Sequence, residues 1–478
     1  MNAKIYSFLI MLLVLNPAFG QFLDSLDVHM GSTASIASKD YQPLWLVSNN
    51  WGTITDSHAD ASTHIAIFNK NILTNPYGIE NGFYLKYGAD LYLNNQNKNV
   101  FFEQLFLKAG YKNLEFKAGR FEEITGVVDQ DLSTGSLGIS GNSLPIPKIG
   151  LAISEYTDVP LTNGFLQFKG TFYHGWLGTD NYIKNAYLHE KSLFLRFGKS
   201  RLKVIVGGEH FAEWGGHRQG LTLGNSFKDF ENVVFVRWKN DGSFADTASN
   251  KSYAGDSRIV MDGAIEWEGD NFTLKFYQQT PFESGDGFGF KNTDALRGIS
   301  VTFHKNTGIT KIVGEYLNTT QMFDFIPIGQ RESYYNNWQY KTGWEYDDKI
   351  IGTPLFINRV RGNHYFSYVK PFNWNASADS IPMNANIISN RVVGFNLGLA
   401  GVLFKKLAIK GMFTYTKNFG TYDEGPFYAT ALTQYYTMLQ MALPVLNDKL
   451  EIKTIIGYDF GELSNNVGLN LAATWKIK

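Results

Sequence analysis

Residues 466–478 read NVGLNLAATWKIK. Apolar and polar residues alternate along this stretch with a period of two, the period at which the side chains of a β-strand point to opposite faces. One face carries Val467, Leu469, Leu471, Ala473, Trp475 and Ile477. The other carries Asn470, Thr474, Lys476 and Lys478. The stretch therefore predicts a strand with one apolar face and one polar face.

The same alternation recurs in segments of roughly ten residues from about residue 80 onward. Clear examples read FYLKYGADLYLNN (83–95), KLAIKGMFTYTKN (406–418) and LEIKTIIGYDFG (450–461). Some segments are joined by short polar turns, at 112–113, 198–201 and 447–449. Others are separated by long irregular stretches, at roughly 122–163, 212–228, 240–256, 280–296, 319–356 and 370–390. Short turns at one end and long loops at the other are typical of an outer-membrane β-barrel.

We therefore predict an all-β chain that forms a transmembrane antiparallel β-barrel of about 16–18 strands. Soluble sandwiches would alternate in the same way, but here the strands continue for roughly 400 residues without a linker or a change in composition. A barrel of this size encloses a space, and we expect the long loops to occlude it. Residues 21–80 alternate weakly and are interpreted as a first strand, a cap or a plug, with the barrel at 81–478.

Residues 1–20 predict a cleaved signal peptide. Lys4 precedes the apolar run FLIMLLVL, and small residues after Pro17 lead to a mature start at Gln21. The chain has no cysteine, and its 43 Lys and Arg residues balance 44 Asp and Glu residues, which argues against nucleic acid as a partner. Export and a barrel together predict a location in the cell outer membrane, with membrane lipid and the barrel-assembly machinery as partners.

One long loop is rich in aromatic rings and amides: residues 333–356 read SYYNNWQYKTGWEYDDKIIGTPLF. Long loops in compact proteins are usually functional or disordered, and this density of rings argues against disorder. Rings stack on the apolar faces of sugars and amides bond sugar hydroxyls, so the loop is a candidate polysaccharide site. The candidate residues are Tyr334, Tyr335, Asn336, Asn337, Trp338, Tyr340 and Trp344. An equally weighted interpretation is that the rings pack the loop into the barrel mouth.

Catalytic and metal chemistry are weakly indicated. His210, Glu213 and His217 lie close in sequence, but neither helical nor strand spacing brings all three onto one face as a metal site requires. Ser136 and Ser140 are flanked by glycine, but the nucleophile-elbow pattern GxSxG is absent from the sequence. We therefore predict no enzyme activity, no cofactor and no metal, with an outer-membrane hydrolase as the weakest alternative.

A diffusion channel for anions or oligosaccharides is the main alternative function. Cationic side chains that would line an anion path are Lys86, Lys108, Arg196, Lys203, Arg359 and Arg361. A wet lumen wall balanced by nearby carboxylates explains the same residues, and we favour that interpretation for any single one of them.

Several stretches together resemble the capsule-assembly Wzi family of outer-membrane proteins. They are PLWLVSNNWG (43–52), GSLGISGNSLPIPKIGLAISEYTDVP (135–160), HFAEWGG (210–216), GNSFKDFENVVFV (224–236), YQQTPFESGDG (277–287), EYLNTTQ (315–321) and YYNNWQYKTGWEYDDKIIGTPLF (334–356). They are spread over most of the mature chain, and their order is more specific than any one of them.

This resemblance implies a barrel of about eighteen strands with a loop-occluded lumen. It also implies a lectin-like, non-enzymatic role in holding capsular or other surface polysaccharide at the cell surface. One feature departs from the better-known members of the family, which carry an N-terminal helical bundle, and another departs from the aromatic C-terminal residue of many barrels. No N-terminal helical bundle is evident, and the chain ends Trp475-Lys476-Ile477-Lys478 rather than on an aromatic residue.

Overall fold

The structure is a computed structural model of the chain. It describes residues 26–69, 82–96, 100–239, 252–253, 255–283, 292–322, 333–377, 380–382, 386–422 and 430–477. The predicted signal peptide, residues 1–20, lies outside the described residues. Among the described residues, no helix has both the length and the hydropathy needed to span a bilayer.

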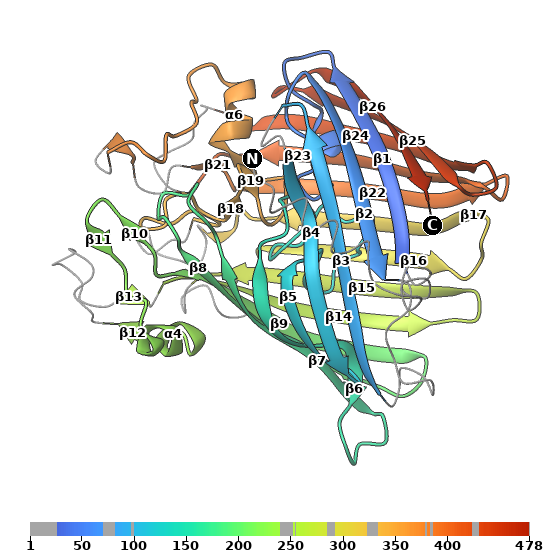
Figure 1. Ribbon diagram of the computed structural model, residues 1–478, viewed down its shortest axis with the longest axis horizontal. Coiled ribbons are helices and arrows are strands. Elements are labelled where there is room, and N and C mark those ends of the chain that lie inside the picture. Colours follow the sequence, from blue (N-terminus) through green and yellow to red (C-terminus); the bar gives the residue numbers. More distant parts are fainter. Residues whose placement is uncertain are drawn as a thin grey trace, which may run out of the picture.

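Eighteen strands form a single antiparallel sheet that closes on itself (Figure 1). In order around the barrel they are β1 (Leu26–Ala37), β2 (Ala59–Asn69), β3 (Phe83–Asn94), β4 (Val100–Tyr111), β5 (Leu114–Arg120), β6 (Lys148–Asp158), β7 (Leu166–Trp176), β8 (Tyr187–Phe197), β9 (Leu202–Trp214), β14 (Asp256–Glu268), β15 (Phe272–Phe282), β16 (Ala295–Phe303), β17 (Gly308–Asn318), β22 (Val392–Leu403), β23 (Leu407–Asn418), β24 (Leu432–Val445), β25 (Leu450–Gly461) and β26 (Asn466–Lys476). The last strand pairs with the first, from His29 opposite Lys476 to Ala37 opposite Gly468. The predicted barrel and its upper strand number are confirmed.

The alternation along the strands exposes apolar side chains and buries polar ones. On β26, Val467, Leu471 and Trp475 are 48%, 49% and 44% exposed, whereas Asn470 is 1% exposed. A soluble protein would do the reverse, because apolar surface is buried away from water. Here the apolar face lies outside the closed wall, where it meets hydrocarbon, and the polar face points inward. The barrel is therefore a transmembrane one, and the sandwich alternative is excluded.

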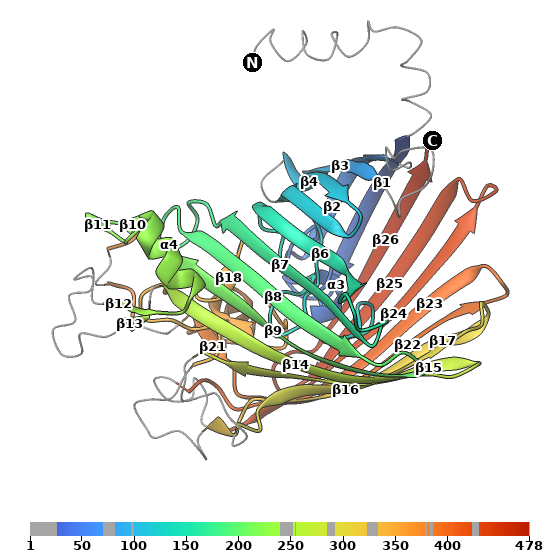
Figure 2. The same cartoon turned by 90° about the horizontal axis from the view of Figure 1, so that it is seen from below.

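The two ends of the barrel differ, as predicted. Strand β1 begins and strand β26 ends at the same rim of the barrel, which we call the turn end (Figure 2). This rim also carries several short connections. Those connections span residues 112–113, 198–201, 269–271, 304–307, 404–406 and 446–449. The longest connections leave the opposite rim, which we call the loop end. The separation is not complete, because residues 95–99 and 462–465 make short connections at the loop end, and residues 70–82 and 159–165 connect strands at the turn end. One of the longest connections lies on the outside of the barrel and contains β10 (His217–Arg218), β11 (Leu221–Thr222), α4 (Phe227–Val234), β12 (Trp238–Lys239) and β13 (Ser252–Tyr253). Its helix α4 packs against the outer face of β8 and β9.

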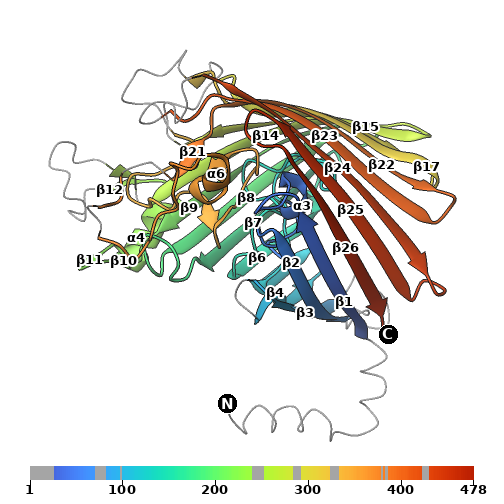
Figure 3. The same ribbon diagram turned by 90° about the horizontal axis from the view of Figure 1, so that it is seen from above.

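Three of the long connections fold inward and form a plug. They are residues 38–58, residues 121–147 and the described residues between 333 and 391. Short elements within them are α3 (Leu44–Val47), β18 (Glu345–Tyr346), β19 (Lys349–Ile350), β20 (Ile357–Asn358), α6 (Arg359–Tyr365) and β21 (Ile387–Ser389). Figure 3 shows α3 enclosed by the strands of the wall and α6 at the mouth of the barrel. The three segments share one hydrophobic core with inward-facing wall residues, and this core occludes the lumen.

The barrel starts earlier than the sequence predicted. Strands β1 and β2 belong to the wall, so the barrel begins at Leu26 rather than at residue 81, and only 38–58 of the N-terminal segment enters the plug. Alternation is weak in β1 because Ser, Thr, Ala and Gly occupy both faces. Strand β6 also lies inside the predicted loop 122–163. Its inward face carries small residues such as Gly150 and Ala152, which blur the contrast between faces.

The two faces of β8 provide a test of membrane orientation. Leu193 points outward and is more than half exposed, whereas Ser192 faces the lumen opposite the buried Glu209. We expect Leu193→Lys to lower the free energy of unfolding in lipid vesicles by about 2–4 kcal/mol, because it places an ammonium group in hydrocarbon. Ser192→Lys is the matched control, and urea titration should show a much smaller loss. Equal losses for the two variants would contradict the assignment of faces.

Candidate functional site

Five of the seven predicted polysaccharide-binding residues lie in the core of the plug. Tyr334, Tyr335, Asn336, Tyr340 and Trp344 are each at most 4% exposed. Ser333, which precedes Tyr334, and Glu345, which follows Trp344, are buried as well. This part of the loop therefore forms the interior of the plug and not its surface.

Hydrogen bonds from these rings tie the segments of the plug together. The Tyr335 hydroxyl donates to the carbonyl of Leu137 at 2.7 Å, and the Trp344 indole N–H donates to the carbonyl of Gly138 at 2.7 Å. The Tyr334 hydroxyl donates to Asp294 Oδ2 at 2.9 Å. Residues 333–356 are thereby joined to residues 121–147 and to the barrel rim. A buried ring with a satisfied polar group fixes position as well as volume.

The two amides serve the backbone. Asn336 donates to the carbonyl of Ile387 at 2.9 Å and accepts from the Ile387 N–H at 2.9 Å, which mimics a strand pair. The Asn337 side chain accepts from the N–H groups of Gln339 and Tyr340 and is half-buried. Trp338 differs from the rest because its side chain is 42% exposed. Of the predicted set, Trp338 and part of Asn337 reach the surface, and the sugar-binding role of the set stays a prediction.

Below Trp344 lies an ion-pair cluster that sequence reasoning missed. Arg258 on β14 sits 5.0 Å from the Trp344 ring and pairs with Glu213 at 3.4 Å and Glu283 at 3.5 Å. It also pairs closely with Asp256. An unpaired buried charge is strongly unfavourable, so Arg258 requires these carboxylates. They therefore stabilise the part of the wall on which Trp344 packs. The sequence alone did not indicate this cluster, because Glu213 and Asp256 become neighbours only through the pairing of β9 with β14.

The structure does not assemble the weaker alternatives. His210 is buried with Nε2 3.1 Å from Ser257 Oγ, Glu213 faces Arg258, and His217 is exposed on β10. Among the described residues, no group of three or more His, Asp or Glu side chains is placed to hold a metal ion. The two candidate serines fasten the plug: their hydroxyls bond Gln279 on the wall and the Gly352 carbonyl.

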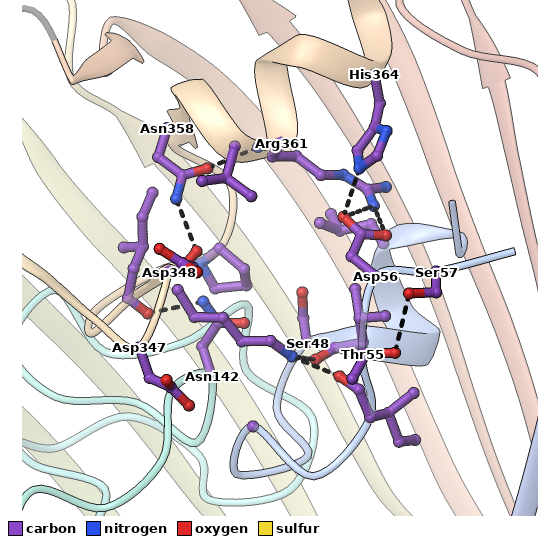
Figure 4. A pocket seen from close by; sticks show the side chains of 18 of the residues that line it. Ser48, Thr55, Asp56, Ser57, Asn142, Asp347, Asp348, Asn358, Arg361 and His364 are labelled. Atoms are coloured by element: carbon purple, nitrogen blue, oxygen red, sulfur yellow. Dashed lines mark hydrogen bonds and ion pairs between the residues drawn. The ribbon is translucent and has the colours of Figure 1, made fainter. Parts of the chain in front are cut away.

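A polar pocket opens at the loop end between residues 44–57, the β18–β19 hairpin and α6 (Figure 4). Its volume is about 250 Å³, somewhat below the range of roughly 300–1,000 Å³ that is usual for small-molecule sites. Polar residues that line it are Ser48, Thr55, Asp56, Ser57, Gln96, Asn142, Asp347, Asp348, Lys349, Asn358, Arg361 and His364. The pocket suits a single ring-sized group rather than a long segment of polymer.

Arg361 holds one wall of this pocket. Its Nη1 lies 2.8 Å from both Asp56 oxygens and donates to the carbonyl of Gln42 at 2.8 Å. His364 Nε2 lies 3.5 Å from Asp56 and its ring stacks on Tyr41 at 4.4 Å. Burial alone would raise the pKa of Asp56, but the Arg361 and His364 side chains override it and hold this pKa below its ordinary value. The pair locks α6 onto the N-terminal plug segment.

Lys349 and Asn358 hold the other side. The Lys349 ammonium donates to the carbonyls of Val47 at 3.1 Å and Ile54 at 2.8 Å. Burial lowers the pKa of Lys349 to about 8, although the Asp56 carboxylate opposes this shift. Asn358 accepts from the Arg361 N–H at 2.9 Å as the N-cap of α6 and donates to Glu345 at 2.6 Å. The two cations of the pocket, Arg361 and Lys349, are therefore both bound by other groups of the protein. The wall of the pocket is preorganised as a result.

The predicted cationic residues divide between wall and plug. Lys86, Lys108, Arg196 and Lys203 lie on inward-facing positions of the barrel wall, whereas Arg359 and Arg361 lie on α6. They do not form one continuous path. The route for anions or oligosaccharides that they suggested would have to pass the plug core.

Comparison with known proteins supports the fold. No protein-family model matches the chain, and no curated protein matches its sequence. Among solved structures, the chain is similar to Wzi, described as a carbohydrate-binding β-barrel outer-membrane protein involved in group 1 capsule assembly in Escherichia coli. That similarity has a TM-score of 0.60 at 12% identity and covers 96% of this chain and 87% of Wzi.

Two further solved structures have lower TM-scores. Pseudomonas aeruginosa OprD has a TM-score of 0.46 at 9% identity, with 94% of each chain covered. Acinetobacter baumannii OccAB2 has a TM-score of 0.45 at 11% identity, with 95% of this chain and 99% of OccAB2 covered. The similarity to Wzi, at a TM-score of 0.60, supports the outer-membrane barrel fold.

The burial of Trp344 yields a prediction about the plug. We expect Trp344→Ala to destabilise the plug by about 3–5 kcal/mol, because it leaves a cavity and removes the bond to Gly138. Trp338→Ala should change stability by at most about 0.5 kcal/mol, because its ring is at the surface. Thermal melting followed by near-ultraviolet circular dichroism measures both, while the far-ultraviolet signal of the strands controls for an intact wall. A neutral Trp344→Ala would contradict the packing role.

The lowered pKa of Asp56 predicts acid sensitivity at the pocket. A carboxyl whose folded pKa lies below its unfolded value stabilises the fold above pH 3.8, and this contribution is lost as pH falls through the folded value. We expect the amides of α6 and residues 42–57 to exchange faster at pH 3 than at pH 7, after correction for intrinsic rates. Asp56→Asn should weaken the same contacts at pH 7 by about 3–5 kcal/mol. Unchanged exchange in this variant would refute the lock.

Proposed function

We propose that this chain is an outer-membrane barrel that binds and retains a surface polysaccharide, such as a capsule, without catalysing its chemistry. The observation that carries the proposal is the combination of a lumen filled by a packed plug with a mouth that bears a polar pocket and the exposed ring of Trp338. A filled lumen suits retention at the surface better than passage.

The pocket chemistry favours a hydroxyl-rich ligand. Its cations are engaged with Asp56 and with backbone carbonyls, while carboxylate, amide and hydroxyl groups line the remaining wall. Such groups accept and donate hydrogen bonds to sugar hydroxyls in fixed directions, and an exposed indole adds a stacking face. A polymer that makes weak contacts at several such points is held through avidity, so modest affinity at each point is sufficient.

Similarity to Wzi supports the same ligand class. Wzi is described as carbohydrate-binding, and the two chains share the barrel over most of their lengths. Polysaccharide, outer-membrane lipid and the barrel-assembly machinery are accordingly the proposed partners. The alternative of a diffusion channel is less well supported because the plug core contains buried apolar residues from all three inward segments.

The distribution of polysaccharide between cells and medium tests the proposal. We expect a strain without this gene to make the polymer but shed it into the medium, and the wild-type gene to restore retention. Trp338→Ala and Asp348→Asn should shed an amount between the two strains, because each removes one of several contacts. Phe227→Ala, which alters an exposed ring on α4 outside the plug, is the matched control.

Two outcomes would overturn the proposal. An unchanged distribution in the deletion strain would remove the polysaccharide role. A steady open conductance of the purified wild-type protein in planar bilayers would favour the channel instead. Immunoblots of outer-membrane fractions must show equal amounts of each variant, so that a loss of retention is not a loss of protein.

A further inference from the structure

Lysine recurs at one position of the barrel wall. Nine strands run from the turn end toward the loop end, and in seven of them the fourth residue is lysine. These residues are Lys86, Lys117, Lys169, Lys275, Lys311, Lys410 and Lys453. Each has at least one large apolar residue next to it in the strand, on the outward face, so the lysines form a belt that faces the lumen near the turn end, on the side of the plug away from the mouth.

Three lysines adjoin directly at one place in this belt. Lys86 on β3 is the cross-strand partner of Lys108 on β4, and Lys108 is the partner of Lys117 on β5. Neighbouring strands lie about 4.8 Å apart, so the row spans about 10 Å. Like charges directly opposite one another destabilise a sheet. We call this row the lysine triad.

Protein carboxylates balance the lysine triad only in part. Glu115 lies 3.9 Å from Lys86 and 3.4 Å from Lys117. Among the described residues, Lys108 has no carboxylate within 4 Å, and its ammonium instead lies 4.5 Å from the centre of the Phe106 ring. The nearby Glu123 is held by Lys148 at 2.7 Å. Glu115 is therefore the one carboxylate that pairs directly with the lysine triad among the described residues, while Glu122 and Glu123 act on Lys108 from a greater distance.

We propose that the lysine triad is a binding site for an oxyanion of the phosphate class that carries two or more charges. The three ammonium groups supply donors along one line, and the Phe106 and Phe121 rings shield one side of Lys108. The Lys86 side chain is 42% exposed, so the row is reachable from the lumen. Two linked phosphate groups match the span of the row, and the anion removes the repulsion that the register imposes.

This site is separate from the proposed polysaccharide contacts at the mouth and does not depend on them. A phosphate-class group would arrive either as a free small anion that enters from the turn end or as an acidic substituent of a glycan. The ligand chemistry is the same in both cases, and the choice of probe distinguishes the sources.

Calorimetric titration with inorganic pyrophosphate tests the proposal on the full chain folded in a nonionic detergent. We expect saturable binding by the wild type and at least tenfold weaker binding by Lys108→Gln. Lys108→Arg should restore binding because it keeps the charge. Lys453→Gln is the matched control, because this lysine occupies the same strand position but faces Ala442 and Ala472 across the sheet, and it should bind within twofold of the wild type.

Further probes separate the possible results. Mannose 6-phosphate that competes with pyrophosphate more strongly than inorganic phosphate does would assign the site to a phosphorylated glycan, whereas stronger competition by inorganic phosphate would assign it to a free anion. Equal binding by the wild type and Lys108→Gln, or an equal loss in Lys453→Gln, would overturn the triad as a defined site. Heat-dependent gel mobility checks that each variant is folded. In anion-free buffer, Lys108→Gln should melt at or above the wild-type temperature, because it removes the repulsion between adjacent lysines.

Discussion

Closure of the backbone hydrogen-bond network is the constraint on which this structure depends. In hydrocarbon, each unpaired backbone N–H or C=O group costs several kcal/mol, so a sheet that crosses a membrane cannot have a free edge. The pairing of β1 with β26 removes the last edge. Once the wall is closed, its polar face is separated from lipid. The charged and amide side chains of the strands then lie inside the barrel, where they are not exposed to hydrocarbon.

The closed wall also changes what the loops can do. Inside it, the plug can build a dry core with the packing of a soluble domain, and the wall supplies polar partners for it. Glu315 on β17 illustrates this, because its carboxylate accepts hydrogen bonds from Ser133, Thr134 and the Tyr277 hydroxyl. The wall and the plug are therefore one folding unit, and the mouth and the turn end become two separate chemical environments divided by the plug.

The sequence was informative where periodicity is strong and weak where it is absent. Strands such as 83–94 and 466–476 alternate clearly because their outward residues are large and apolar, and they were predicted with their faces. Residues 333–356 have no period, so nothing local distinguishes the buried Trp344 from the exposed Trp338, which lie six residues apart. Their environments are set by partners more than a hundred residues away, such as Gly138, and the Arg258 cluster arises from cross-strand register in the same way.

The seam between the first and last strands carries a consequence for the timing of assembly. Residues 38–58 follow β1 and contact the last hairpin of the barrel: the N–H of Leu44 donates to Asp459 on β25, and the Tyr41 hydroxyl bonds Ser464 in the turn between β25 and β26. On β25 and β26, Gly457 and Gly468 leave the space that Leu46 and Pro43 occupy. The earliest part of the wall and of the plug thus waits for the final thirty or so residues of the chain before it has a stable place. The N-terminal plug segment therefore gains its full set of contacts only when the last hairpin of the chain is in place.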